Sequence, residues 1–208
     1  MDPSFWHQRW QENRIGFHQT QINFHLERFW PQLNVPPGEL VFVPLCGKSL
    51  DMLWLASQGH RVFGVELSPI AVSAFFRENG LTPKIEKSGG FERYVYGEIE
   101  ILCGDFFDLE SLHLRDARGV YDRASLIALP SETRIEYARH LRRILPSRPP
   151  ILLITLDYPK EARQGPPFAV NEEEVRRLYA NAWEVKSIAS ENIESTLREH
   201  VFYLSPPP

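Results

Sequence analysis

The sequence has few cysteines, no long apolar run and no glycine-rich phosphate loop, and each absence excludes a class of protein. Its 208 residues include only two cysteines, Cys46 and Cys103, which excludes both a disulfide-stapled secreted fold and a four-thiolate metal site. No apolar run approaches the roughly 20 residues that span a bilayer. The first nineteen residues also lack the basic-then-apolar pattern of a secretory signal. We therefore expect a cytoplasmic protein that does not associate with membranes.

An excess of positive charge is also absent. The formal net charge is -4 at pH 7, which argues against nucleic acid as the main partner. The seven histidines show no metal-ligand spacing, so we predict no metal. The chain is long enough for one domain with a substantial core, and its prolines form short clusters rather than a linker. We predict a single domain over residues 1–208 and a monomer.

Helical patterns alternate with short apolar runs along the chain. The expected strands are 40–45, 61–66, 119–124 and 150–156, with a hairpin or two short strands in 91–102 and a closing pair at 183–192 and 197–204. The expected helices are 20–33, 49–58, 69–79, 131–145 and 171–181. This order predicts an α/β fold: a mainly parallel sheet with a terminal antiparallel hairpin and helices on both faces.

The most distinctive segment is the turn P-L-C-G-K-S at residues 44–49, with the single acid Glu66 ending the next strand. Ligands of open α/β sheets bind beyond the carboxyl ends of the strands, where both features are expected. A carboxylate about 20 residues after a glycine turn is placed to accept the two hydroxyls of a ribose. The spacing therefore predicts an adenosine-containing cofactor. The alternative is that Gly47 only permits the turn and Glu66 only caps the next helix.

Several cofactor classes compete for this turn. A nucleoside triphosphate loop needs glycine where Phe42 stands, five residues before Gly47-Lys48, so we reject it. A dinucleotide fold needs G-x-G-x-x-G, of which only Gly47 is present. A nicotinamide-dependent oxidoreductase is therefore the runner-up function. S-adenosylmethionine has no pyrophosphate, so one glycine and one acid suffice for it. A third possibility is a cofactor-binding sensor without turnover.

Ordered motifs across nearly the whole chain resemble the thiopurine S-methyltransferase family, including its bacterial members. They are W-x-x-R-W at 6–10, G-F-H-Q at 16–19, V-P-L-C-G-K-S-L-D-M at 43–52, G-H-x-V-x-G-V-E-L-S at 59–68, G-D-F-F at 104–107, Y-D-R-A-S-L at 121–126 and G-P-P-F at 165–168. The resemblance implies the Rossmann-like, seven-stranded sheet of class I methyltransferases. It also implies in-line methyl transfer from S-adenosylmethionine, which leaves S-adenosylhomocysteine, to a small thiol. Residues 1–35 would form a helical cover over the active site, in which 1–19 can act as a lid, and 38–208 the sheet core.

The resemblance also assigns residues to the cofactor. By position these are Trp10, Leu45, Gly47, Glu66, Asp105, Phe106 and Arg123. Glu66 would hold the ribose, and Asp105 and Phe106 the adenine. Two alternatives stay open: Trp10 can be a core residue packed against Trp6, and Asp105 can simply form a turn.

On the acceptor side, the resemblance points to an apolar pocket formed by Phe17, Pro166, Pro167 and Phe168. No catalytic base is obligatory, because a thiol with a pKa near 8.5 is partly ionised at neutral pH. We assign His18 a structural role rather than that of a base. Arg123, or else Arg198, can stabilise the anionic acceptor. Thiopurines, other small aromatic thiols and selenium or tellurium compounds all fit, and no residue selects among them.

Overall fold

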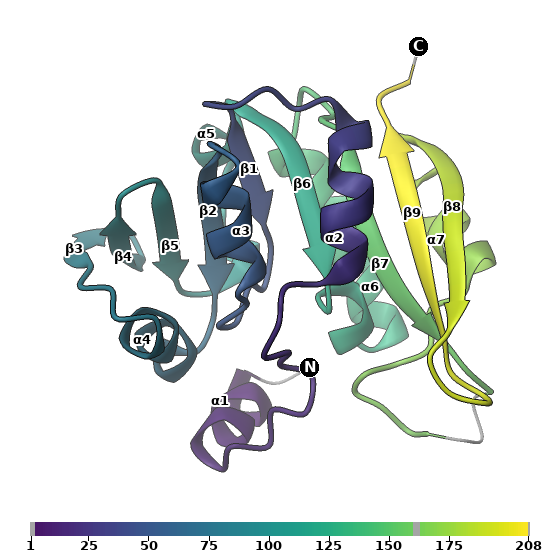
Figure 1. The fold of residues 1–208 in the computed structure, drawn as a ribbon, viewed down its shortest axis with the longest axis horizontal. Coiled ribbons are helices and arrows are strands. Elements are labelled where there is room, and N and C mark those ends of the chain that lie inside the picture. The colour runs from purple at the N-terminus through teal and green to yellow at the C-terminus, as the bar shows by residue number, and fades with distance from the viewer. Residues whose placement is uncertain (1–2, 160–162, 208) are drawn as a thin grey trace.

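One twisted sheet organises the molecule (Figure 1), which is described by a computed structural model over residues 3–159 and 163–207. The first two residues of the predicted cover, residues 160–162 and the last residue therefore lie outside the description. The strands follow the order β3-β4-β5-β2-β1-β6-β7-β9-β8. They are β1 (Leu40–Val43), β2 (Arg61–Glu66), β3 (Lys84–Ser88), β4 (Phe91–Tyr96), β5 (Ile99–Cys103), β6 (Ala117–Arg123), β7 (Ile151–Asp157), β8 (Glu184–Asn192) and β9 (Arg198–Ser205).

The predicted sheet type is confirmed, but the predicted number of strands is wrong. The central strands β5, β2, β1, β6 and β7 run parallel, and β8 and β9 form the expected antiparallel hairpin beside β7. The described sheet has nine strands rather than seven. The opposite edge carries β3 and β4, which pair antiparallel with one another and join the sheet through β5.

Helices cover both faces of this sheet (Figure 1). One face carries α2 (Phe24–Phe29), the 3-10 helix η1 (Trp30–Leu33), α3 (Asp51–Ser57) and α4 (Pro69–Glu78). The other carries α5 (Ser111–Leu114), α6 (Ser131–Ile144) and α7 (Glu172–Tyr179). The short 3-10 helices η2 (Phe106–Asp108) and η3 (Leu126–Ala128) follow β5 and β6 directly. The first helix, α1 (Pro3–Gln11), lies beyond the carboxyl ends of the central strands.

Alternating side chains of the buried strands build a core on each side of the sheet. In β1, Leu40 and Phe42 join the core under α6 and α7, whereas Val41 and Val43 join the core under α2 to α4. Because side chains of a strand point alternately to the two faces, such strands read as continuous apolar runs. Packing on both faces therefore holds the sheet rigid. The loops that follow the carboxyl ends of its strands start from fixed positions.

The predicted helix at 20–33 is divided into α2 and η1. Asn23 caps α2, because its side-chain oxygen accepts the N–H groups of His25 and Leu26. Pro31 lies in the first turn of η1, where a residue without an N–H is tolerated. Both elements pack into the sheet core through Leu26, Phe29, Trp30 and Leu33, so this part of the predicted cover lies on the sheet.

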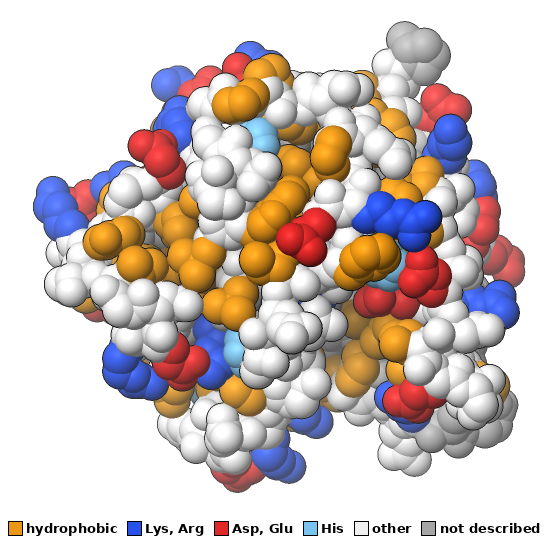
Figure 2. Space-filling view, viewed as in Figure 1, with side chains coloured by type: hydrophobic (Ala, Val, Ile, Leu, Met, Phe, Trp, Pro, Cys, Tyr) orange, Lys and Arg blue, Asp and Glu red, His pale blue; other side chains and the backbone are white. Residues whose placement is uncertain are grey.

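The surface on the α2 and α3 side mixes charges of both signs. Figure 2 shows acidic and basic side chains interspersed around the rim of this face, with apolar side chains gathered nearer its centre. No helix within residues 3–159 and 163–207 has both the length and the apolar character needed to cross a membrane.

Candidate functional site

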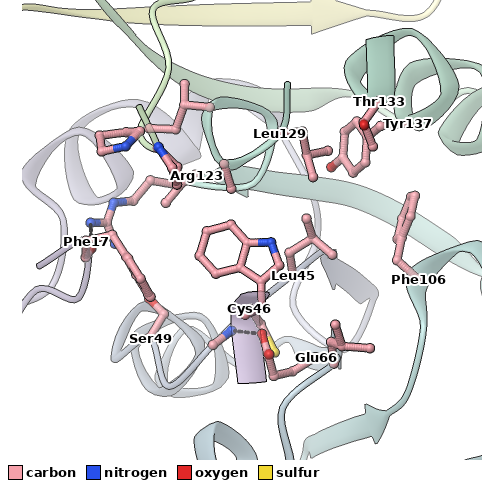
Figure 3. A pocket seen from close by; sticks show the side chains of 18 of the residues that line it. Phe17, Leu45, Cys46, Ser49, Glu66, Phe106, Arg123, Leu129, Thr133 and Tyr137 are labelled. Atoms are coloured by element: carbon pink, nitrogen blue, oxygen red, sulfur yellow. Dashed lines mark hydrogen bonds between the residues drawn. The ribbon is translucent and has the colours of Figure 1, made fainter. Parts of the chain in front are cut away.

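A cavity of about 310 Å³ opens at the carboxyl ends of β1, β2, β5 and β6. The turn after β1 and the end of β2 form its floor, and η2 and α6 form one wall. The N-terminal segment supplies Pro3, Trp6, Trp10, Phe17 and His18, so α1 and the loop after it cover the cavity. Figure 3 shows Leu45, Cys46 and Glu66 between two ends, one formed by Phe106 and Tyr137 and the other by Phe17 and Arg123.

Glu66 fixes the turn after β1. One carboxylate oxygen accepts the N–H of Gly47 at 2.9 Å, and the other accepts the N–H of Ser68 at 2.8 Å. Gly47 has φ +53°, a conformation that glycine adopts without strain, and a side chain on it would meet the ring of Trp10 at 3.4 Å. Gly47 thus presents backbone without a side chain to the cavity. Each oxygen of Glu66 still has a lone pair that can accept a further hydrogen bond.

Burial changes the pKa of Glu66. The residue is only 7% exposed, and burial raises its pKa, against the opposing effect of the N–H donors of Ser68 and Gly47. A charged carboxylate in such a place is stabilised by additional donors. The site is therefore built to receive hydroxyl or N–H groups from a ligand.

The Phe106 end of the cavity is an aromatic slot. The rings of Phe106 and Tyr137 stack with centroids 4.8 Å apart. The Tyr137 hydroxyl donates to buried Asp122 at 2.7 Å, which fixes the orientation of the ring. Asp105 also lines the cavity, and its Oδ1 accepts the N–H of Phe107 at 2.9 Å. Asp105 thus has the turn-forming role considered above, and it also faces the cavity.

The other end of the cavity is cationic and tied to the N-terminal segment. Arg123 donates to the carbonyl oxygen of Phe17 at 3.3 Å and lies 3.6 Å from Asp51. Asp51 also accepts the Tyr121 hydroxyl at 2.9 Å and the backbone N–H of Asn23 at 2.8 Å. This network connects β6, α3 and the chain before α2. It leaves a half-buried guanidinium facing the cavity.

Two further titratable groups in the cavity are held neutral near pH 7. Burial, together with the nearby Lys48 and Arg123, lowers the pKa of His18. Burial, and then the charge of Glu66, raises the pKa of the Cys46 thiol well above its ordinary value. Lys48 lines the cavity and pairs with Glu78 at 2.7 Å.

Most of the predicted site residues meet in this one cavity. Every predicted cofactor residue lines it, as do Phe17, Pro166 and Pro167. Phe168 does not: its N–H donates to the Ile127 carbonyl, and its ring lies 5.9 Å from the guanidinium of Arg134. Arg198 lies on β9, where it donates to Asn192. The functional roles of all these residues stay predictions.

The structure adds lining residues that sequence reasoning missed. They are chiefly Trp6, Cys46, Leu129, Thr133 and Tyr137. Cys46 and Trp6 stand inside the quoted motifs, which could have indicated them. Leu129, Thr133 and Tyr137 come from α6 and the loop before it, where no motif marks them.

Comparisons with known proteins agree with this arrangement. The family model described as thiopurine S-methyltransferase matches residues 1–202. A thiopurine S-methyltransferase of Pseudomonas putida is 48% identical over 99% of this chain and 100% of its own length. That of Azotobacter vinelandii is 50% identical over 98% and 92%.

Solved structures share the fold at low sequence identity. A SAM-dependent methyltransferase of Anabaena variabilis superposes with a TM-score of 0.67 at 14% identity, over 99% of this chain and 95% of its own. The class I methyltransferase fold predicted above is thereby confirmed. From the family model and the identity to curated relatives, the chain belongs to the thiopurine S-methyltransferase family.

Proposed function

We propose that this protein methylates the sulfur of a small aromatic thiol, such as a thiopurine, with S-adenosylmethionine as methyl donor. The observation that carries the proposal is the buried Glu66 carboxylate, which fixes the Gly47 turn and faces an otherwise largely apolar cavity. The family and the fold both agree with this assignment.

The residues present fit this donor at three positions. Both Glu66 oxygens can still accept ribose hydroxyls, and a planar base can pack beside the stacked rings of Phe106 and Tyr137, whose facing sides already contact one another. Trp10 and Gly47 lie beside one another in the lining of the cavity. S-adenosylmethionine, when bound, supplies a sulfonium whose methyl group is the electrophile. An indole face near that cation would attract it.

The acceptor is expected at the Phe17 and Arg123 end. Trp6, Phe17, Pro166 and Pro167 exclude water there, and Arg123 can attract an anionic sulfur. A thiolate that attacks a sulfonium neutralises charge, so a dry site does not penalise the transition state as it penalises the separate ions. Orientation then supplies much of the rate, since well-aligned reactions gain roughly 7–11 kcal/mol. The neutral His18 is not required as a base.

We propose one domain that acts as a monomer in the cytoplasm, without nucleic acid, membrane or metal as a partner. The net charge of -4 and the mixed charges on the face in Figure 2 support the absence of a nucleic-acid partner. Selenium and tellurium compounds belong to the proposed acceptors, because their softer anions suit the same apolar, cationic end.

A methyl-transfer screen tests the function. Purified protein would be incubated with S-adenosylmethionine and a panel of thiopurines, thiophenols and selenium or tellurium compounds, with release of S-adenosylhomocysteine as the readout. Turnover on at least one aromatic thiol supports the proposal. A thermal shift produced by a nicotinamide dinucleotide but not by S-adenosylhomocysteine would instead support the oxidoreductase, and binding of S-adenosylhomocysteine without turnover on any acceptor would support a sensor.

A further inference from the structure

A second hollow, of about 510 Å³, lies beside α6 and is rich in arginine. Its lining residues are Phe107, Glu136, Arg139, His140, Arg142, Arg143 and Arg148. Phe107 and Glu136 also line the first cavity, so the two spaces share a wall near the aromatic slot. The proposed function does not use this second hollow.

The four arginines of this hollow outnumber the one acid in its lining, Glu136. Within the described parts of the chain, no carboxylate forms an ion pair with Arg139, Arg142 or Arg143. Arg143 instead donates to Nδ1 of His140 at 2.7 Å, which leaves the proton of a neutral imidazole on Nε2. Burial and the charge of Arg143 lower the pKa of His140, so the partner of this guanidinium is a neutral imidazole that does not balance its charge.

Arg148 is held in place by backbone groups. It donates to the carbonyl oxygens of Arg142 and Leu145, and its guanidinium lies 5.5 Å from the ring centroid of Trp183. Burial and the like charge of Arg142 lower its pKa. One guanidinium is thereby fixed beside others of the same sign.

The position of these residues in the helix explains only part of the cluster. Arg142 and Arg143 stand in the last turn of α6, where the helix dipole favours cations. Arg139 lies a turn earlier and Arg148 lies beyond the helix, yet both face the same hollow. The chain as a whole carries a net charge of -4, so the concentration of positive charge is local.

We propose that this hollow binds a phosphate-class anion, separately from the methyl-transfer cavity. Arginine guanidiniums offer paired N–H donors that match phosphoryl oxygens, and several in one hollow suit an anion of more than one charge. A pyrophosphate group, free or carried by a small metabolite, has this chemistry. The bound anion would lie across the wall of Phe107 and Glu136 from the aromatic slot.

Isothermal titration calorimetry of the whole protein with inorganic pyrophosphate tests the proposal. The titration is made at constant ionic strength with S-adenosylhomocysteine saturating, so that the first cavity is filled. We expect one pyrophosphate to bind. The double variant Arg139→Gln/Arg142→Gln should weaken its binding at least roughly tenfold, as expected for the loss of charge-assisted hydrogen bonds, with little change in S-adenosylhomocysteine affinity. Both side chains lie at the protein surface rather than in its core, so the fold should be kept.

A double variant with the same change in net charge controls for general charge. Arg77→Gln/Arg118→Gln removes two exposed cations, one on α4 and one on β6, both outside the second hollow. Equal weakening in this control would mean long-range attraction only and would overturn the proposal. So would absence of binding at millimolar pyrophosphate, or displacement of pyrophosphate by S-adenosylhomocysteine. A nucleoside diphosphate that binds more tightly than pyrophosphate would identify a phosphorylated metabolite as the source of the anion.

Discussion

Glu66 combines a structural and a binding role in a single side chain. Its two oxygens hold the amides of Gly47 and Ser68, and the same oxygens are the expected ribose acceptors. Replacement by alanine would therefore remove the ribose contact and also release the turn. Glutamine keeps the shape of the side chain but has a single accepting oxygen, so it retains one of the two amide contacts and disturbs the turn less than alanine does.

Glu66→Gln should weaken S-adenosylhomocysteine binding by about 2–3 kcal/mol, because a carboxylate accepts hydroxyl hydrogen bonds more strongly than an amide does. Calorimetry at pH 7 measures the change, and far-UV circular dichroism checks the fold. Glu98→Gln, at an exposed position in the β4–β5 turn, is the matched control. Unchanged affinity in Glu66→Gln would remove the ribose assignment.

His18→Gln should retain most of the turnover on an acidic aromatic thiol. The acceptor provides its own thiolate, and the pKa of His18 is lowered by burial and neighbouring cations, so it does not supply a positive charge at pH 7. Measured kcat and KM for one thiol over pH 6 to 9 test this. If kcat collapsed while S-adenosylhomocysteine still bound normally, His18 would be the base after all.

The predictability of a site residue depended on where it stands in the fold. Glu66 and Gly47 follow apolar strands whose ends are visible in the sequence, so their meeting could be predicted. Tyr137 lies on the buried side of an ordinary amphipathic helix, and nothing in its spacing distinguishes a cavity residue from a core residue. Its partner Asp122 stands in the Y-D-R-A-S-L motif, but their hydrogen bond could not be predicted, because it depends on how α6 packs on β6.

At the scale of elements, the N-terminal segment is the least anchored part of the site. Trp10 is the only buried residue of α1. Edge-to-face contacts join Phe17 to Trp6 and Trp10, with centroids 5.8 and 5.7 Å apart, and Arg123 binds the Phe17 carbonyl. Segments with so few buried contacts open locally at low free-energy cost.

Binding of S-adenosylhomocysteine should slow amide exchange in α1 and in the loop to His18. The ligand would fill the cavity that Trp6, Trp10 and Phe17 cover, and so add contacts to the closed state. Hydrogen–deuterium exchange with mass spectrometry measures this, with the β8–β9 hairpin as the internal reference. Equal exchange of α1 with and without ligand would exclude a lid that closes on the cofactor.

Elements with a clear apolar period were predictable, and elements without one were not. The strands β1, β2 and β7 lie where continuous apolar runs indicated them. The edge strand β3, K-I-E-K-S, is mostly exposed and has only one apolar residue, so only its pairing with β4 defines it. The expected helix at 20–33 is interrupted because its last residues form the tighter η1, which contains Pro31.

At the scale of the whole molecule, stability should depend on the ionisation of buried Asp122. Burial raises its pKa from 3.8 to about 6, against the opposing hydrogen bond from Tyr137. Between these two values the folded state binds a proton that the unfolded state has released. The free energy of unfolding therefore falls as the pH rises from about 4 to about 6, by on the order of 3 kcal/mol for this group.

Asp122→Asn should remove this part of the pH dependence, because asparagine does not titrate and its oxygen can still accept from Tyr137. Urea unfolding at several pH values from 4 to 7 measures the free energy of unfolding of the variant and of the parent. The value for the variant minus the value for the parent should increase as the pH rises. A difference that stays constant over this range would contradict the assignment.

The buried thiol of Cys46 has a consequence for the survival of the enzyme itself. Cys46 lines a cavity that is proposed to hold a strong alkylating agent, and its sulfur packs against Gly64 of β2. Because burial and the charge of Glu66 keep this sulfur protonated, it is a poor nucleophile near neutral pH. We therefore expect Cys46 to remain unmethylated over many turnovers. Only an acceptor that binds with an ionised sulfur should be methylated.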